Sequence, residues 1–159
     1  MTKILVAYFS ASGITERAAK TLAEAANADV YEIKPAVAYT AADLNWLDKN
    51  SRSTIEMQNY TSRPEIIEDN AQIEQYDTIF LGFPIWWYLA PTIVNTFLEK
   101  YDFSNKNIII FATSGGSGFG KTIDNLKSSV SSSAKITEGK ILSRNVTVGE
   151  LKEWIKTVL

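Results

Sequence analysis

The sequence predicts a doubly wound α/β fold, in which helices cover both faces of a parallel sheet. Three apolar runs support this prediction, at residues 4–9, 78–83 and 107–112. None of the three alternates with polar residues, which is typical of strands that are buried on both faces. An amphipathic stretch follows each run, and strands that alternate with helices in this way favour parallel pairing.

The strands are expected where apolar residues gather between turn-forming stretches. Three of them coincide with the long apolar runs, the second in the chain is short, and the fifth is weak. The expected strands are, in order, Ile4–Phe9, Val30–Ile33, Thr78–Phe83, Asn107–Ala112 and Lys140–Leu142.

The helices are expected where apolar residues recur every three or four positions. Leu22 lies among alanines on the expected face of the first helix, and Trp154 lies on the face of the last one. The expected helices are, in order, Glu16–Asn27, Thr92–Tyr101, Lys121–Val130 and Val148–Leu159.

The segment Pro35–Gln75 is too long for a plain connection. Thr40 and Asp43 have the spacing of a helix N-terminal cap, so a short helix is expected to begin there. The stretch Asn50–Pro64 is expected to be irregular. Long loops of this kind are often functional, and this one would leave from the edge of the sheet that binds ligands.

The composition limits the chemistry that the chain can perform. Its 159 residues are about the size of one ordinary domain, so a single domain is expected over residues 1–159. The chain contains no histidine and no cysteine, which excludes a Ser-His-Asp triad, a cysteine nucleophile, and zinc sites built on imidazole or thiolate. Catalysis would have to use other side chains or a bound cofactor.

Charge and hydropathy argue against two classes of partner. The net charge is −2 and the Lys and Arg residues are scattered, so no nucleic-acid binding is expected. The most membrane-like stretch, Ile79–Leu98, contains two prolines and a polar face, so no transmembrane helix is expected either. The N-terminal run lacks the length and the cleavage site of a signal peptide, which predicts a cytoplasmic protein.

The loop after the first strand, Ser10–Thr15, has the features of a phosphate site. Three hydroxyl side chains surround Gly13, which allows a tight turn into the first helix. Backbone N–H groups at a helix start and the helix dipole both favour an anion there. The loop contains no Lys or Arg, so neutral donors are expected to hold the anion. The alternative is a simple helix cap made by Ser12 or Thr15.

The loop after the third strand contains three consecutive aromatic residues, Trp86, Trp87 and Tyr88. Consecutive side chains cannot all point into the core, so at least one is expected to face a cavity. A flat apolar ligand such as a flavin ring would suit that position. The alternative is a purely structural aromatic corner.

The loop after the fourth strand matches the P-loop pattern over Gly115–Thr122. A P-loop NTPase also needs an Asp at the end of a neighbouring strand for its magnesium ion. None of the apolar strands ends in one, because Asp77 precedes its strand. Glycines that let the backbone approach a flat ring explain the loop as well.

Together, the three loops resemble those of the flavodoxin-like flavoproteins, in particular the small flavodoxin and NAD(P)H:quinone reductase branches. Residues 8–15 are similar to the family's phosphate loop, residues 82–91 to its aromatic loop, and residues 113–118 to its Gly-Gly loop. The resemblance covers essentially the whole chain. It implies a flavodoxin-like three-layer α/β/α fold with a five-stranded parallel sheet of order 2-1-3-4-5, and FMN at the carboxyl ends of the strands.

The resemblance also implies which residues bind FMN, without a catalytic side chain or a metal. The first loop would hold the phosphate, the aromatic loop would meet the ring, and the third loop would enclose its pyrimidine side. Ile14 stands where many relatives have Asn, which removes one side-chain donor. The implied residues are Ser10, Ala11, Ser12, Gly13, Ile14, Thr15, Pro84, Ile85, Trp86, Trp87, Tyr88, Thr113, Ser114, Gly115, Gly116, Ser117 and Gly118.

Three functions are open at this point. The first is an FMN-binding carrier that transfers electrons to a redox partner protein. The alternative is an NAD(P)H-dependent FMN oxidoreductase that acts on quinones or similar acceptors. A P-loop nucleotide binder is a distant third. For the oxidoreductase, Arg52 and Arg63 would be available to bind phosphates, unless they are paired with Glu56 or Glu65.

Overall fold

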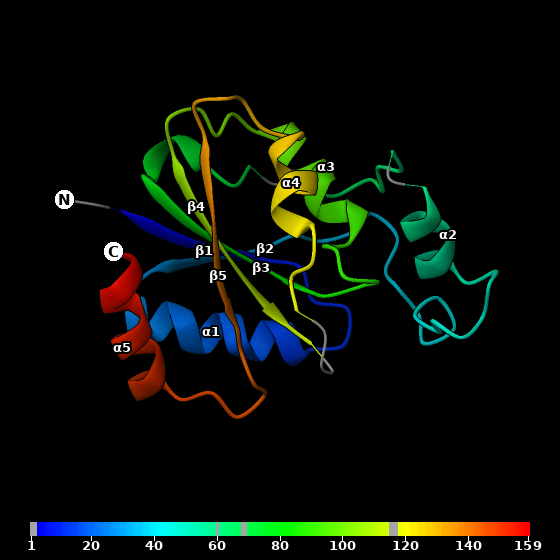
Figure 1. Ribbon diagram of the computed structural model, residues 1–159, viewed down its shortest axis with the longest axis horizontal. Coiled ribbons are helices and arrows are strands. Elements are labelled where there is room, and N and C mark those ends of the chain that lie inside the picture. Colours follow the sequence, from blue (N-terminus) through cyan, green and yellow to red (C-terminus); the bar gives the residue numbers. More distant parts are fainter. Residues whose placement is uncertain (1–2, 60, 68–69, 115–117) are drawn as a thin grey trace.

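The computed structural model describes residues 3–59, 61–67, 70–114 and 118–159. A five-stranded parallel sheet of order β2-β1-β3-β4-β5 lies between two layers of helices (Figure 1). This is the fold and the strand order that the sequence predicts. The strands are β1 (Ile4–Tyr8), β2 (Asp29–Glu32), β3 (Thr78–Pro84), β4 (Asn107–Thr113) and β5 (Lys135–Ile141).

The register of the sheet brings the strand ends together. Tyr8 of β1 pairs with Gly82 of β3, and Pro84 of β3 pairs with Thr113 of β4. The loops that follow β1, β3 and β4 therefore leave from the same edge. Open α/β sheets bind their ligands at this edge, so the fold places all three predicted loops where a ligand is expected.

Each layer of helices covers one face of the sheet with its own core. On one face, α1 (Ile14–Ala26) and α5 (Val148–Val158) lie side by side and pack against residues such as Phe80 and Phe111. On the other face, α3 (Thr92–Lys100) and α4 (Thr122–Lys127) cover a second core that contains Phe9, Phe83 and Phe97. Burial of these large side chains contributes about 1.5–3 kcal/mol each.

The fifth strand begins five residues earlier than the sequence indicates. β5 runs from Lys135 to Ile141, not from 140 to 142, and it lies at the edge of the sheet with several exposed side chains. An edge strand needs no continuous apolar run, so the polar residues of β5 do not show the pattern by which a buried strand is predicted. A Cβ atom at Gly139 would lie 2.1 Å from the Ile110 carbonyl oxygen, so β5 can approach β4 there only with glycine.

The segment before β3 also differs from the prediction. Thr40 and Asp43 do exchange the two hydrogen bonds of a cap, at 2.9 and 3.1 Å, but only turns follow them. Leu47 is 74% exposed, so this turn has no core against which a helix would be stabilised. The helix of this segment is α2 (Arg52–Gln58), inside the stretch that was expected to be irregular, and Ser51 caps it. A short 3₁₀ turn, η1 (Ile73–Gln75), precedes β3.

The helices of the described ranges are also relevant to the membrane prediction. Within those ranges, no helix combines the length and the apolar character that crossing a membrane requires. The longest helix in those ranges, α1, has 13 residues. A spanning helix needs about 20 apolar residues.

Candidate functional site

A cavity of about 440 Å³ opens at the carboxyl edge of the sheet. Four loops line it, because β1, β3, β4 and β5 all end there. Two of its walls come from the first and second predicted loops, one from the third, and one from the loop after β5. The lining residues are Ser12, Ile14, Pro84, Ile85, Trp86, Thr113, Ser114, Leu142, Ser143 and Arg144.

The loop after β1 presents the start of α1 to this cavity. Gly13 precedes the helix with a φ of +93°, a conformation that favours glycine, and its N–H donates to the Ser10 Oγ at 3.0 Å. Among the residues that the structure describes, no side chain caps the helix. The N–H groups of the first helical turn therefore have no intrahelical acceptor, which makes them donors for an anion. The alternative of a side-chain cap by Ser12 or Thr15 is wrong.

Thr15 is hydrogen-bonded to a residue that lines the main cavity. Its side chain is buried, and its Oγ1 lies 2.7 Å from the Thr113 Oγ1. This hydrogen bond ties the loop after β1 to the loop after β4. The Thr15 side chain therefore positions the two loops, while its backbone N–H remains part of the helix start.

Two arginines that the sequence analysis missed lie beside this helix start. A second cavity of about 520 Å³ is lined by Ser12, Gly13, Ile14, Arg17, Arg144 and Asn145. Arg144 lines both cavities. Guanidinium groups recognise phosphate by charge-assisted hydrogen bonds, so these arginines offer charged donors beside the neutral ones of the loop, whose sufficiency stays a prediction. The available signal was the position of Arg144 just after the fifth strand, at the ligand edge.

The aromatic loop is a tight and strained turn. Trp86 and Leu89 exchange two backbone hydrogen bonds, at 2.9 and 3.1 Å. Between them, Trp87 and Tyr88 have φ values of 51° and 65°, the pattern of a type I′ turn, which Asn and Gly normally occupy. Large side chains in this conformation store strain of order 1 kcal/mol or more each, and such strain concentrates at functional sites.

The three aromatic side chains of this turn do not share one environment. Trp86 is half-buried and lines the 440 Å³ cavity. Trp87 and Tyr88 are 43% and 63% exposed and line another cavity, of about 580 Å³. The other residues around that cavity are Leu89, Gly120, Lys121, Asp124 and Asn125. The structure therefore separates Trp86 from the two residues with which it was grouped.

The loop after β4 contributes Thr113 and Ser114 to the main cavity. Gly118 is exposed and is not among the residues around it. The predicted residues Gly115, Gly116 and Ser117 lie outside the described part of the chain. Ser10, Ala11 and Gly13 shape the first loop without lining the main cavity itself.

The end of the P-loop pattern is occupied by protein contacts. Thr122, whose hydroxyl would bind magnesium in a P-loop, is fully buried and donates to the carbonyl oxygens of Phe119 and Tyr88. α4 has only six residues. Among the residues that the structure describes, no group of three acidic side chains is placed to hold a metal. These contacts argue against a nucleoside-triphosphate site.

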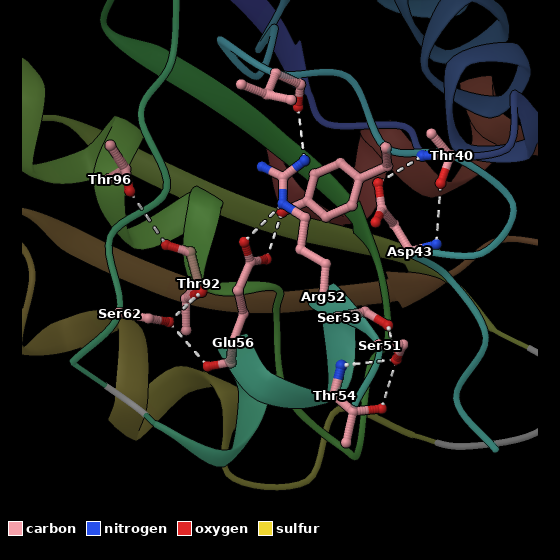
Figure 2. A network of polar contacts seen from close by, with 12 residues as sticks. Thr40, Asp43, Ser51, Arg52, Ser53, Thr54, Glu56, Ser62, Thr92 and Thr96 are labelled. Atoms are coloured by element: carbon pink, nitrogen blue, oxygen red, sulfur yellow. Dashed lines mark hydrogen bonds and ion pairs between the residues drawn. The ribbon is translucent and has the colours of Figure 1, made fainter. Parts of the chain in front are cut away.

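The two arginines of the 50–64 segment are engaged elsewhere. Arg52 forms an ion pair with Glu56, with 3.0 Å between Nε and Oε2, and donates to the Val37 carbonyl at 2.7 Å (Figure 2). Arg63 pairs with Glu99 at 2.9 Å. The Arg63 guanidinium and a bond from Ser129 hold the pKa of Glu99 below its usual range. Arg52 therefore has the Glu56 partner that the alternative expected, and Arg63 has Glu99 as a partner.

Comparison with known proteins agrees with this geometry. A family model described as Flavodoxin matches residues 3–158. No curated protein sequence matches the chain. Among solved structures, a provisionally assigned flavoprotein from Bacteroides eggerthii is 43% identical, with a TM-score of 0.92 over 99% of this chain and 98% of that one.

Two further solved structures extend the comparison. A provisionally assigned flavoprotein from Bacteroides uniformis is 48% identical, with a TM-score of 0.90 over 98% of both chains. A flavoprotein from Lactobacillus acidophilus, solved in complex with FMN, is similar in fold at 22% identity, with a TM-score of 0.68 over 98% of this chain and 99% of that one. Because the family model spans nearly all of the sequence and the sheet has the doubly wound order, the chain belongs to the flavodoxin family.

Proposed function

We propose that this chain is an FMN-binding flavoprotein that transfers electrons. The observation that supports this best is the 440 Å³ cavity, in which an open helix start and an aromatic side chain face the same space. Cavities of this size hold small organic molecules, and FMN has a flat ring at one end and a phosphate at the other. The Lactobacillus acidophilus relative is described in complex with FMN.

The phosphate end fits the loop after β1. The N–H groups at the start of α1 and the Ser12 hydroxyl would donate to the phosphate oxygens. Arg144, which lines both cavities, would balance the negative charge. A dianion held this way binds far more tightly than a neutral group of the same shape, which makes FMN a better ligand than riboflavin.

The ring end fits the wall that Pro84, Ile85 and Trp86 form. Thr113 and Ser114 face this wall from the neighbouring loop and offer polar groups to the ring edge. An apolar wall with a few fixed polar groups is typical of sites for flat cofactors. These residues bind the ring, orient it and exclude water from one of its faces.

The chemistry of such a site comes from the cofactor. FMN, when bound, supplies reversible uptake of one or two electrons. Of the described residues that line the main cavity, none is Asp, Glu, Lys or Tyr, so proton transfer by a side chain is not part of the proposal. This lining supports an electron carrier. We also propose that the protein is cytoplasmic, as the sequence predicts.

An NAD(P)H-dependent oxidoreductase is the second candidate. It requires a further flat site beside the flavin, where a nicotinamide or a quinone can stack. The 580 Å³ cavity next to Trp87 and Tyr88 favours this function, because both side chains are exposed and Lys121 lies at the same cavity. Hydride transfer needs stacking and alignment more than acid–base residues, so this candidate is compatible with the main cavity.

Two measurements test the proposal in sequence. The purified protein, loaded with FMN and desalted, should keep the absorbance spectrum of an oxidised flavin; loss of the flavin on desalting would contradict FMN binding. The loaded protein is then mixed anaerobically with NADH or NADPH in a stopped-flow instrument. A carrier should stay oxidised for minutes, whereas bleaching within seconds, slowed in Lys121→Ala, would assign the oxidoreductase.

A further inference from the structure

A network of polar contacts connects α2 to the wall of the main cavity. Glu56 accepts two hydrogen bonds, one from the Arg52 Nε at 3.0 Å and one from the Tyr39 hydroxyl at 2.5 Å (Figure 2). The two carboxylate oxygens of Glu56 therefore bind Arg52 within α2 and Tyr39, which lies 17 residues before Glu56 in the chain. Glu56 joins the helix to the turn-rich segment that precedes it.

Arg52 completes a closed arrangement around the Tyr39 ring. The guanidinium carbon lies 3.8 Å from the centroid of that ring, within the range of a cation–π contact. The Arg52 Nη1 donates to the Val37 carbonyl at 2.7 Å, which fixes the backbone just before Tyr39. The side chains of Arg52 and Glu56 are only 23% and 14% exposed. This ion pair is therefore better shielded than an ordinary surface pair, which contributes little.

The Tyr39 ring also contacts the wall of the main cavity. Its ring makes edge contacts with Phe9 and Trp86, with both centroid distances at 5.6 Å. Phe9 and Trp86 also contact each other edge to face, at 5.8 Å and 89°. Phe9 is fully buried directly after β1, so it is fixed by the sheet. Tyr39 is thus a contact of Trp86 that is held from outside the sheet.

We propose that Tyr39, held by Arg52 and Glu56, is a positioning residue that fixes the Trp86 indole at the cavity wall and thereby determines how that indole packs against the flavin. The flavin part rests on the proposed function. Burial, together with the Glu56 hydrogen bond, raises the pKa of the Tyr39 hydroxyl, so it stays protonated and keeps donating to Glu56. The segment before α2 becomes part of the cofactor site without touching the cofactor.

The first test measures the coupling between Tyr39 and Trp86 in the flavin-free protein. Urea unfolding is measured for Tyr39→Leu, Trp86→Leu and the double variant. Aromatic pairs contribute beyond their buried area, so the double variant should be less destabilised than the sum of the two single ones. Additive losses would overturn the proposal, whatever the protein does with FMN.

The second test measures the effect on the flavin. Tyr39→Leu should weaken binding of FMN and of riboflavin alike by about tenfold. The reason is that the Trp86 indole loses the aromatic contact that positions it against the flavin ring. It should also change the circular dichroism of the bound flavin. Tyr39→Phe keeps the ring and Glu56→Gln keeps an acceptor, so each should weaken binding by only about threefold. Unchanged affinity and dichroism in Tyr39→Leu would overturn the proposal.

A matched control and the wild type separate the possible failures. Glu153→Gln breaks another helical ion pair, with Lys156 on α5, at side chains that are more than 70% exposed. It should leave flavin affinity and dichroism unchanged; an effect equal to that of Glu56→Gln would overturn the role of the network. The wild type could also fail to bind FMN while Tyr39 and Trp86 are coupled in the flavin-free protein. That result would overturn the proposed function and the flavin part of this inference, and would leave the Tyr39–Trp86 contact established.

Discussion

The two ends of the main cavity are built in different ways. The proposed phosphate end is local, because Ser10, Gly13 and the first turn of α1 follow one another within a few residues. The proposed ring end is assembled from distant segments, since Trp86 contacts Phe9 and Tyr39. A local site can be recognised as a sequence motif, whereas an assembled site depends on the whole fold. The two ends should therefore respond differently to substitution and to the choice of ligand.

The largest effect is expected at the ring end. Trp86→Ala removes the indole that would pack against the ring. Burial of about half of a large aromatic side chain, at roughly 25 cal/mol per Å², corresponds to about 2–3 kcal/mol of binding free energy. FMN and riboflavin should lose the same amount, because both carry the ring. Fluorescence titration of the two ligands measures this. A loss confined to FMN would show that Trp86 serves the phosphate end instead.

The complementary substitution is Ser12→Ala at the phosphate end. One hydrogen bond to a charged group contributes about 1.5–3 kcal/mol, so FMN affinity should fall roughly tenfold or more. Riboflavin lacks the phosphate and should bind as before. Ser143→Ala, at the same cavity but after β5, is a matched control and should change FMN affinity less. Equal losses for both ligands in Ser12→Ala would contradict the assignment of the two ends.

A pH effect is expected beneath the phosphate loop, at Tyr8. Burial, followed by the charges of Glu32 and Glu16, raises the pKa of Tyr8 to about 12. The unfolded chain releases this proton near pH 10 whereas the folded protein keeps it, so stability is full below pH 10 and falls as pH rises toward 12. The slope is up to about 1.4 kcal/mol per pH unit.

Urea unfolding at several alkaline pH values measures this slope. Tyr8→Phe removes the ionisable group and keeps the ring, so its stability should fall less steeply above pH 10 than that of the wild type. Burial and the hydrogen bond to Asp29 also raise the pKa of Tyr76 to about 12. Tyr76 is present in both proteins. Identical slopes would mean that Tyr8 does not carry the effect.

A smaller effect tests the strained turn at the ring end. Asn and Gly tolerate the positive φ that Trp87 and Tyr88 adopt, so the double substitution Trp87→Asn, Tyr88→Gly should stabilise the protein by about 1 kcal/mol. At this chain length such a gain raises Tm by roughly 2–4 °C. Differential scanning calorimetry measures it. A lower Tm would mean that the exposed rings stabilise the fold more than their backbone strains it.

The contrast between the two ends also explains what could be predicted from the sequence. β1, β3 and β4 are buried on both faces, so their apolar runs identify them and the strand order follows from the family resemblance. β5 is an edge strand and its polar residues conceal most of it. Ser51 caps α2, a local signal that the prediction did not use, whereas the contacts of α2 with the earlier segment are not recorded in short-range patterns.

The candidate site divides in the same way. The loop after β1 could be predicted because its glycine, hydroxyls and helix start are adjacent in the chain. Arg144 was missed because the strand before it was weak, and with it the loop after β5. The role of Tyr39 required knowing that residues 9, 39 and 86 meet in space, which only the tertiary structure determines.

Isothermal titration calorimetry of the flavin-free protein with FMN, FAD and riboflavin tests the central claim most directly. We expect one FMN bound per chain and riboflavin binding at least about a hundredfold weaker, because two or more hydrogen bonds to a charged phosphate are absent. FAD should bind more weakly than FMN, since the helix start suits a terminal phosphate. Equal affinity for FMN and riboflavin, or tighter binding of FAD, would show that the helix start does not bind the FMN phosphate.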